Sequence, residues 1–153
     1  MKPTAANRSG GNRLGFLAFG LDEGEFAVEL DAIREIVMPP PLTPVPRSGP
    51  GIEGVVAIRG QVVTVVDLRT LLGLSPSLWP RSARLLLIDF QGEPLAVLID
   101  QVGGVYNFLA DRLEPATELE GAARGEYVRA LARTDGGRIV TILDLPRLLA
   151  ENL

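Results

Sequence analysis

The chain has 153 residues, of which 46% are hydrophobic and 22% charged, and its formal net charge of -4 disfavours a polyanionic partner such as nucleic acid. It contains no cysteine and no histidine, which excludes disulfides, thiolate metal sites and the commonest general base. We therefore expect no metal, no cofactor and no enzyme activity. The length fits one domain, or two small subdomains that share a core. Its 17 glycines and 12 prolines disfavour a helix bundle and favour strands and turns.

The N-terminal segment predicts a tail followed by a strand pair. Residues 1–13 read as a flexible tail, and the apolar stretch from Leu14 is too short and too soon followed by acidic residues for a signal peptide. No stretch approaches the roughly 18 apolar residues of a membrane span. We expect a cytoplasmic protein without membrane insertion. The sequence LAFGLDEGEFAV then has the turn chemistry of a hairpin, with an acidic, solvated tip.

The next segment is rich in proline. Residues 38–46, MPPPLTPVP, predict an extended connection between strand pairs, because proline cannot donate to a sheet; a polyproline ligand is the alternative. Residues 49–54, GPGIEG, match a dinucleotide-binding pattern. The flanking segments PLTPVPRS and VVAI do not supply the strand before it or the helix after it. We interpret this segment as a loop.

An internal repeat is the most informative feature of the chain. Residues 63–72, VTVVDLRTLL, return at 140–149 as VTILDLPRLL, an offset of 77. Residues 27–33, AVELDAI, return at 96–102 as AVLIDQV, an offset of 69. Each longer copy predicts a buried strand that ends at an aspartate N-cap and continues as a short helix. Capping accounts for both aspartates without acid–base chemistry.

The repeat predicts a mainly β fold built from two similar halves. A single domain at about 14–149 divides into subdomain 1 at about 14–74, a linker at 75–83 and subdomain 2 at about 84–149. Each half offers about five strands, enough to curl into a small closed barrel. Two packed barrels would leave a groove between them, and such grooves commonly bind ligands.

Arg59 is not explained by the turn in which it lies. The corresponding bend of the second half, Thr134 to Gly137, reads TDGG and contains no arginine. Glu35 likewise has Gly104 or Val105 as its counterpart. A loop arginine beside apolar strands suits a protein interface, where arginine is enriched among energetic anchors. Surface charges also drift between repeats, and this comparison alone leaves both interpretations open.

Several short motifs resemble the CheW-like family of chemotaxis adaptor domains over about residues 14–149. In chain order they are IREI at 33–36, VP at 45–46, IEGV at 52–55, RG at 59–60 and DLR at 67–69. The resemblance implies two five-stranded SH3-like barrels. It also implies a non-enzymatic scaffold that couples the cytoplasmic tip of a chemoreceptor to the regulatory domain of a CheA-type histidine kinase.

The same motifs imply where partners bind. The implied partner-binding residues are Ile33, Glu35, Val45, Pro46, Gly54, Arg59 and Gly60. We hypothesise that Arg59 and Glu35 flank an apolar patch with Ile33 and Val45-Pro46, that one barrel binds the kinase and that the groove receives the receptor's helical hairpin. Ala57 and Ala130 depart from residues common in the family, which leaves open whether the pathway controls swimming, pili or gliding.

Two other classes of function remain as alternatives. One is a small β-barrel enzyme that works through carboxylates such as Asp67 or Asp100, which would need a deep pocket with convergent titratable groups. The other is a generic peptide-binding β module outside chemotaxis, which would use its sheet edges or the proline-rich connection.

Overall fold

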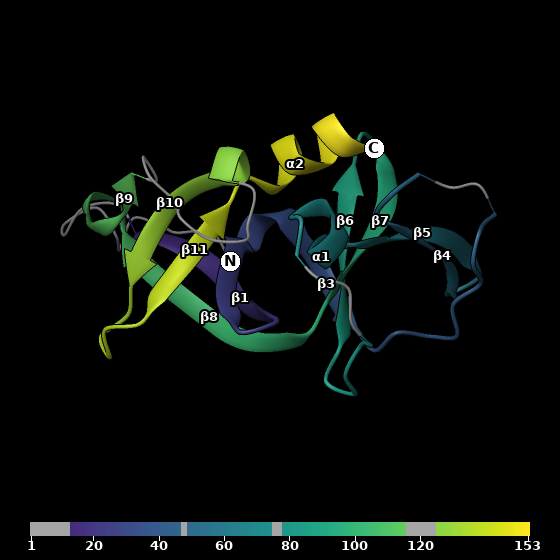
Figure 1. Cartoon of the computed structure of the whole chain (residues 1–153), viewed down its shortest axis with the longest axis horizontal. Coiled ribbons are helices and arrows are strands. Elements are labelled where there is room, and N and C mark those ends of the chain that lie inside the picture. Colours follow the sequence, from purple (N-terminus) through teal and green to yellow (C-terminus); the bar gives the residue numbers. More distant parts are fainter. Residues whose placement is uncertain (1–12, 47–48, 75–77, 116–124) are drawn as a thin grey trace.

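A computed structural model describes residues 13–46, 49–74, 78–115 and 125–153. The predicted tail therefore lies outside the described residues except for Arg13, and so does the start of the predicted linker. The described chain is mainly β, as predicted, and its strands form one six-stranded and one five-stranded sheet. Figure 1 shows the two sheets beside each other, with the helices α1 and α2 near the junction between them.

The six-stranded sheet has the strand order β8-β1-β2-β11-β10-β9. Its strands are β1 (Arg13–Leu21), β2 (Gly24–Glu29), β8 (Gln101–Leu109), β9 (Glu114–Pro115), β10 (Val128–Arg133) and β11 (Ile139–Leu143). The five-stranded sheet has the order β3-β6-β7-β5-β4. Its strands are β3 (Ile33–Val37), β4 (Ile52–Ile58), β5 (Gln61–Asp67), β6 (Arg84–Phe90) and β7 (Glu93–Ile99). Short 3-10 turns are η2 (Leu30–Ala32), η3 (Ala110–Arg112) and η4 (Gly125–Tyr127).

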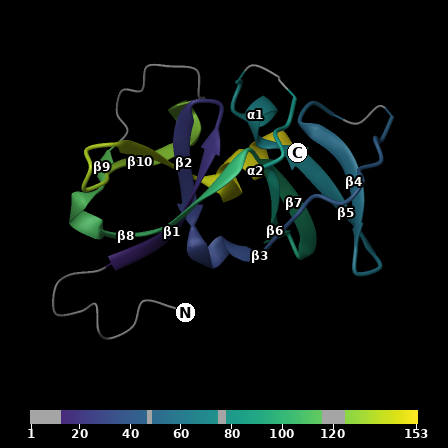
Figure 2. The same cartoon turned by 90° about the horizontal axis from the view of Figure 1, so that it is seen from below.

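The two halves of the repeat exchange their hairpins. The β1–β2 hairpin of the first half joins the sheet of β8 to β11, and the β6–β7 hairpin of the second half joins the sheet of β3 to β5. The exchange is visible in Figure 2, where β2 lies with β10 and β7 lies with β5. The boundary at 75–83 therefore separates the repeats in sequence, but it does not separate the sheets.

The register of the exchanged strands follows the repeat. In the five-stranded sheet β5 runs parallel to β7, with Thr64 opposite Leu95. In the six-stranded sheet β11 runs parallel to β2, with Thr141 opposite Phe26. These two pairs are related by the same offsets of 77 and 69 that relate the sequence copies. The repeat is thus a repeat of strand pairing as well as of sequence.

The largest hydrophobic core lies between the sheets. It contains Leu17, Phe19 and Val28 from the six-stranded sheet and Val66, Leu86 and Val97 from the five-stranded one, together with leucines of both helices. Each sheet also encloses a smaller cluster of its own, around Phe16 and Ile142 in one and around Val65 and Leu85 in the other. Most of the buried apolar side chains therefore lie at the junction of the two sheets, and this shared core joins the sheets into one folding unit.

Both predicted aspartate caps are present. α1 (Leu68–Leu71) begins after Asp67, whose carboxylate accepts hydrogen bonds from the Arg69 amide at 2.9 Å and the Thr70 hydroxyl at 3.0 Å. α2 (Leu145–Asn152) begins after Asp144, which accepts from the Arg147 amide at 3.2 Å. The prediction of short helices after the Asp-Leu motifs is confirmed. The role of Asp67 is therefore structural: its carboxylate caps the N-terminus of α1.

Glu53, on β4, shares its environment with the Asp67 cap. Burial raises the pKa of the Glu53 carboxyl above its ordinary value of 4.5, and the charge of Asp67 and a hydrogen bond between the two side chains raise it further. The folded protein therefore binds this proton more tightly than the unfolded chain does. Stability then falls as the pH rises from 4.5 through the raised pKa, because the ionised form is disfavoured only in the folded state.

Replacing Glu53 by glutamine is expected to raise the melting temperature at pH 7. Glutamine keeps a hydrogen-bonding group at this position but carries no charge to be buried. The advantage should be complete at neutral pH and should disappear well below pH 4.5, where Glu53 is protonated in both the folded and the unfolded state. Thermal unfolding of both proteins at the two pH values measures it. An advantage that does not change with pH would contradict the assignment.

Candidate protein-interaction site

The turn between β4 and β5 consists of Arg59 and Gly60. Both residues have positive φ angles, 50° and 78°, which is the geometry of a two-residue hairpin turn of type I′. Gln91 and Gly92 form the same turn in the β6–β7 hairpin, with φ angles of 54° and 82°. The hairpin therefore demands the backbone shape but not the arginine side chain. Asparagine suits the first position better, since other L-residues lose about 1 kcal/mol there.

The Arg59 side chain forms an ion pair with Glu35 of β3. β3 and β4 stand at opposite ends of the strand order, so the pair connects the two edges of the curled five-stranded sheet. The side chains are 66% and 38% exposed. An ion pair in this much water contributes no more than about 1 kcal/mol to stability. The guanidinium is thus held in place yet accessible to a partner.

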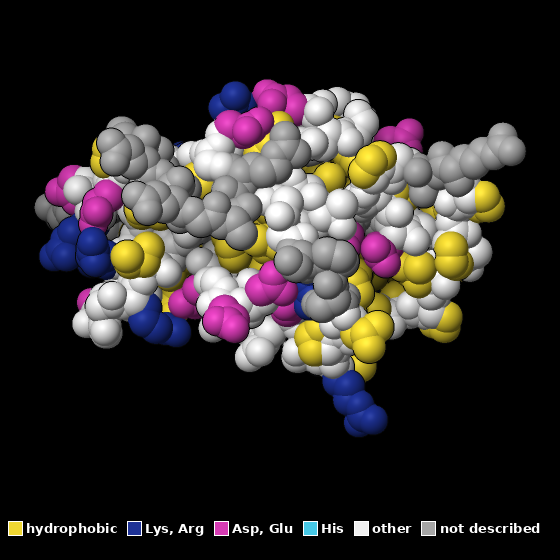
Figure 3. Space-filling model, viewed as in Figure 1, with side chains coloured by type: hydrophobic (Ala, Val, Ile, Leu, Met, Phe, Trp, Pro, Cys, Tyr) yellow, Lys and Arg dark blue, Asp and Glu magenta, His cyan; other side chains and the backbone are white. Residues whose placement is uncertain are grey.

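Exposed apolar side chains come from the same sheet and from the connection between β3 and β4. Met38 and Val62 are each 69% exposed, Ile36 is 40% exposed and Val45 is 39% exposed. Figure 3 shows hydrophobic side chains at the surface over the end of the molecule where this sheet lies. Ile36 directly follows Glu35 and therefore faces the other side of β3, whereas Val62 follows the Arg59 turn by two residues. An exposed arginine in a sheet that also exposes apolar groups has a composition typical of an interface.

Ile33 does not contribute to this exposed surface. It is partly buried, lies opposite Ile88 in the β3–β6 ladder and packs against the core between the sheets. Ile33 therefore adds little exposed surface beside Arg59 and Glu35, and its role in partner binding stays a prediction. β3 exposes Ile36 instead, because burial alternates between successive residues of this strand and Ile36 lies an odd number of positions from Ile33. The alternation along IREIV could have identified Ile36 once one buried position was known.

The proline-rich segment connects β3 to β4, as predicted, and runs along the outer edge of β4. Thr43 pairs with Val55 through two backbone hydrogen bonds of 2.9 and 2.8 Å. Gly54 makes this close approach possible: its φ angle is +152°, and a Cβ at this position would lie 2.3 Å from the Thr43 carbonyl oxygen. Val45 and Pro46 continue from Thr43 as exposed residues. Gly54 therefore shapes the site without presenting a side chain to a partner.

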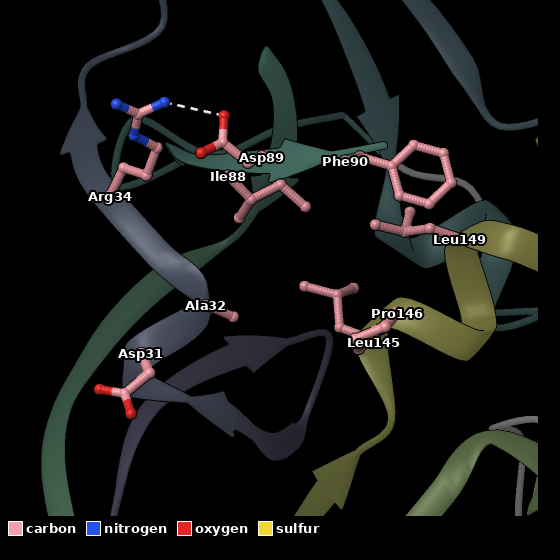
Figure 4. Close-up of a pocket in the computed structure, with 9 residues that line it drawn as sticks. All are labelled: Asp31, Ala32, Arg34, Ile88, Asp89, Phe90, Leu145, Pro146 and Leu149. Atoms are coloured by element: carbon pink, nitrogen blue, oxygen red, sulfur yellow. Dashed lines mark hydrogen bonds and ion pairs between the residues drawn. The ribbon is translucent and has the colours of Figure 1, made fainter. Parts of the chain in front are cut away.

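A groove lies at the junction of the two sheets. One hollow of about 200 Å³ is lined by residues of η2, β3, β6 and α2, shown in Figure 4. Those residues are Asp31, Ala32, Arg34, Ile88, Asp89, Phe90, Leu145, Pro146 and Leu149. A second hollow of about 200 Å³ shares Ala32, Leu145 and Pro146 with the first and extends towards Val28 and Leu143. The predicted groove is therefore present, and Ala32, Leu145 and Pro146 line both of its hollows.

The groove has an apolar floor and a charged rim. Ile88, Phe90 and Leu149 approach one another across the floor in Figure 4, and the side chain of Ala32 points towards Leu145. At the rim Arg34 pairs with Asp89 at 2.8 Å, with both side chains more than half exposed. Apolar floors with a few polar groups at the edge suit the packing of helical side chains.

The remaining candidates for chemistry have structural roles. Asp67 caps α1, and the Asp100 carboxylate lies 2.6 Å from the Arg69 guanidinium. In the described ranges no three acidic side chains gather in a way that could hold a metal ion. Within those same ranges no helix has both the length and the apolar character that crossing a membrane requires.

Comparisons with known proteins agree with this arrangement. Residues 15–152 match the family model of the CheW-like domain. The chain is 28% identical over 135 residues to a chemotaxis protein CheW of Thermotoga maritima, an alignment that covers 88% of this chain and 87% of that protein. It is 24% identical over 135 residues to a probable chemotaxis protein CheW of Rhizobium etli, covering 88% and 86% respectively.

The fold matches a solved structure as well. The crystal structure of the scaffolding protein TtCheW from Thermoanaerobacter tengcongensis superposes with a TM-score of 0.79 at 22% identity, covering 88% of this chain and 91% of that one. The predicted mainly β fold is thereby confirmed. Because the family model spans nearly all of the described domain, this chain belongs to the family of CheW-like domains.

Proposed function

We propose that this protein couples a chemoreceptor to a CheA-type histidine kinase through two separate surfaces. The protein is a non-enzymatic scaffold of chemotaxis signal transduction, as CheW-like domains are. We place it in the cytoplasm on the same family basis. This family membership favours the scaffold function over the two alternatives, a carboxylate enzyme and a generic peptide-binding module. The observation that carries the finer proposal is the Arg59 turn, where an exposed arginine occupies a position that asparagine would fill at lower cost.

The Arg59 turn is the proposed contact with the kinase regulatory domain. Arg59, Glu35 and the exposed Val62 belong to the five-stranded sheet alone. A partner that covers them would desolvate an arginine beside apolar groups, which is the environment of interface hot spots. Val45 and Pro46 would extend the contact, while Gly54 and Gly60 would act by shaping the backbone. Burial of apolar area would supply affinity, and the charges would set register.

The groove is the proposed contact with the receptor. Its two hollows adjoin each other at Ala32, Leu145 and Pro146, so they could receive successive apolar side chains of a helix. The Arg34–Asp89 pair at the rim offers both signs of charge to such a helix. The surface of a helical hairpin fits a groove of this kind by placing one apolar stripe on the floor. The two partners would then occupy different parts of the scaffold.

Changing Arg59 to alanine is expected to weaken binding of the kinase regulatory domain about tenfold or more, as for a hot-spot residue. The melting temperature should hardly change, because alanine keeps the same strained backbone and only an exposed ion pair is lost. Calorimetric titration and thermal unfolding measure the two quantities.

Arg133 provides a matched control for this variant. It is 59% exposed and pairs with Glu114 at 3.0 Å, but it lies on β10 of the other sheet. Arg133→Ala should leave the affinity for the kinase domain unchanged. If Arg59→Ala binds as well as the parent protein, or if it unfolds at a much lower temperature, the proposed role of Arg59 is refuted.

A further inference from the structure

A buried arginine connects the two sheets. Arg69 lies on α1, directly after β5 of the five-stranded sheet. Its side chain is only 3% exposed. Its Nη2 lies 2.6 Å from Oδ1 of Asp100, and its Nε lies 3.6 Å from Oδ1 of Asp22. The indole ring of Trp79 stacks on the guanidinium, with 4.1 Å between Cζ and the ring centroid. The charge is thus enclosed by two carboxylates and an aromatic ring.

The two carboxylates belong to other parts of the fold than α1 does. Asp22 lies in the turn between β1 and β2 of the six-stranded sheet, and Asp100 lies between β7 and β8, where the chain crosses from one sheet to the other. The Asp22 amide donates to Oδ2 of Asp100 at 2.8 Å. The Asp100 amide donates to the Gly20 carbonyl at 3.1 Å, and the Ser82 hydroxyl donates to the Asp100 carbonyl at 2.7 Å. Groups from both sheets therefore converge on Asp100 and Arg69.

The strand–cap–helix unit does not itself need this arginine. At the offset of 77 the position of Arg69 corresponds to Pro146, which occupies the first turn of α2 after the Asp144 cap. A proline there supports the same local structure without any charge. The second copy of the repeat thus shows that Arg69 serves something beyond its own helix.

Burying Arg69 is also a poor way to gain stability. Removing two charges from water costs free energy that their attraction only partly returns, and hydrophobic side chains of similar volume often stabilise a core as well or better. What a buried ion pair adds is a defined relative position of the two groups that form it. The leucines and phenylalanines of the core between the sheets make contacts that tolerate sliding. The Arg69 guanidinium, in contrast, is held in one place by the short ion pair with Asp100 and by the stacked Trp79 ring.

We propose that Arg69 is a positioning residue that fixes the orientation of the two sheets, and through it the shape of the groove. The groove depends on this orientation because its walls come from both sides: β3 and β6 belong to the five-stranded sheet, while α2 follows β11 of the six-stranded sheet. The Arg59 turn lies within one sheet and does not depend on it. The consequence for partner binding rests on the proposed function, but the orientation itself does not.

This separation predicts a distinctive pattern of binding. The paired variant Arg69→Met with Asp100→Asn removes both charges and leaves no buried ion without a partner, so it should fold. It is expected to bind a helical-hairpin fragment of a chemoreceptor tip about tenfold more weakly. Its affinity for the kinase regulatory domain should not change. The single variant Arg69→Lys keeps a positive charge next to Asp100. It should bind the receptor fragment more tightly than the paired variant does and more weakly than the parent protein does.

The orientation can be measured without any partner. The chain contains no cysteine, so spin labels can be attached at introduced cysteines alone. A pair at Ala57 and Asp135, both exposed, reports the distance between the sheets, and a pair at Ala57 and Glu93 reports the five-stranded sheet alone. Pulsed electron paramagnetic resonance should show a shifted or broader distribution between the sheets in the paired variant. The distribution within one sheet should remain that of the parent protein.

The outcomes distinguish this inference from the proposed function. A folded paired variant whose distance distribution between the sheets equals that of the parent overturns the positioning role of Arg69. Loss of affinity for both partners to the same extent would also overturn it, because the Arg59 turn should not sense the groove. If the parent protein itself binds neither fragment, the proposed function fails while the distance measurement still decides the role of Arg69.

Discussion

Gly54→Ala is expected to destabilise the protein by about 2–4 kcal/mol, an effect at the upper end for a single methyl group. The added Cβ would lie 2.3 Å from the Thr43 carbonyl oxygen, and the φ angle of +152° is one that L-residues with side chains avoid. Relief requires Thr43 to leave the edge of β4, with loss of its two hydrogen bonds to Val55. Chemical denaturation followed by circular dichroism measures the free energy of unfolding.

Gly60→Ala is the matched control for that change. Gly60 also has a positive φ angle, +78°, but a Cβ there would have no heavy atom within 4 Å. Only the conformational penalty of about 1 kcal/mol is then expected. Equal losses for the two variants would show that the clash with Thr43 is not the cause, and that the connection at 38–46 does not depend on Gly54.

Ala32→Phe is expected to weaken binding of the receptor fragment strongly while leaving binding of the kinase domain intact. Ala32 lines both hollows of the groove, and its side chain points inward in Figure 4, so an aromatic ring would occupy the space that a partner needs. The loss should be about a hundredfold, since central anchors of an interface carry most of its free energy. Titration of each partner separately measures it.

Ala110→Phe controls for the cost of adding a ring to a 3-10 turn. Ala110 opens η3, is exposed and does not line the groove. This variant should bind both partners as the parent protein does. If Ala32→Phe still binds the receptor fragment as the parent protein does, the groove is not the receptor-binding site.

The repeat made much of this fold predictable. The offsets of 77 and 69 identified the strands, the aspartate caps and the helices after them, because those features depend on local sequence. The exchange of hairpins could not be predicted in the same way. Two similar halves contain the same strands, so a hairpin can pair with its own half or with the other at almost the same local cost. The choice depends on long-range packing, in which Phe19 and Leu86 meet in a shared core.

The candidate site shows the same division. The turn at Arg59 and Gly60 between two strands followed from residue types, but its type I′ geometry and the ion pair of Arg59 with Glu35 were not predicted. The inward direction of Ile33 and the exposure of Ile36 depended on strand register, which a one-residue slip reverses. The burial of Arg69 was the hardest to foresee, since a charged residue in a short helix is usually exposed. The contrast with Pro146 in the second copy was the available signal.

The most direct test of the account is a titration of the parent protein with the kinase regulatory domain and with the receptor-tip fragment, separately and together. Two surfaces that do not overlap predict that each partner binds alone and that saturation with one leaves the other's site available, so a ternary complex forms. Analytical ultracentrifugation would identify that complex by its mass. Competition between the two partners, or no binding of either, would contradict a scaffold that couples them through the Arg59 turn and the groove.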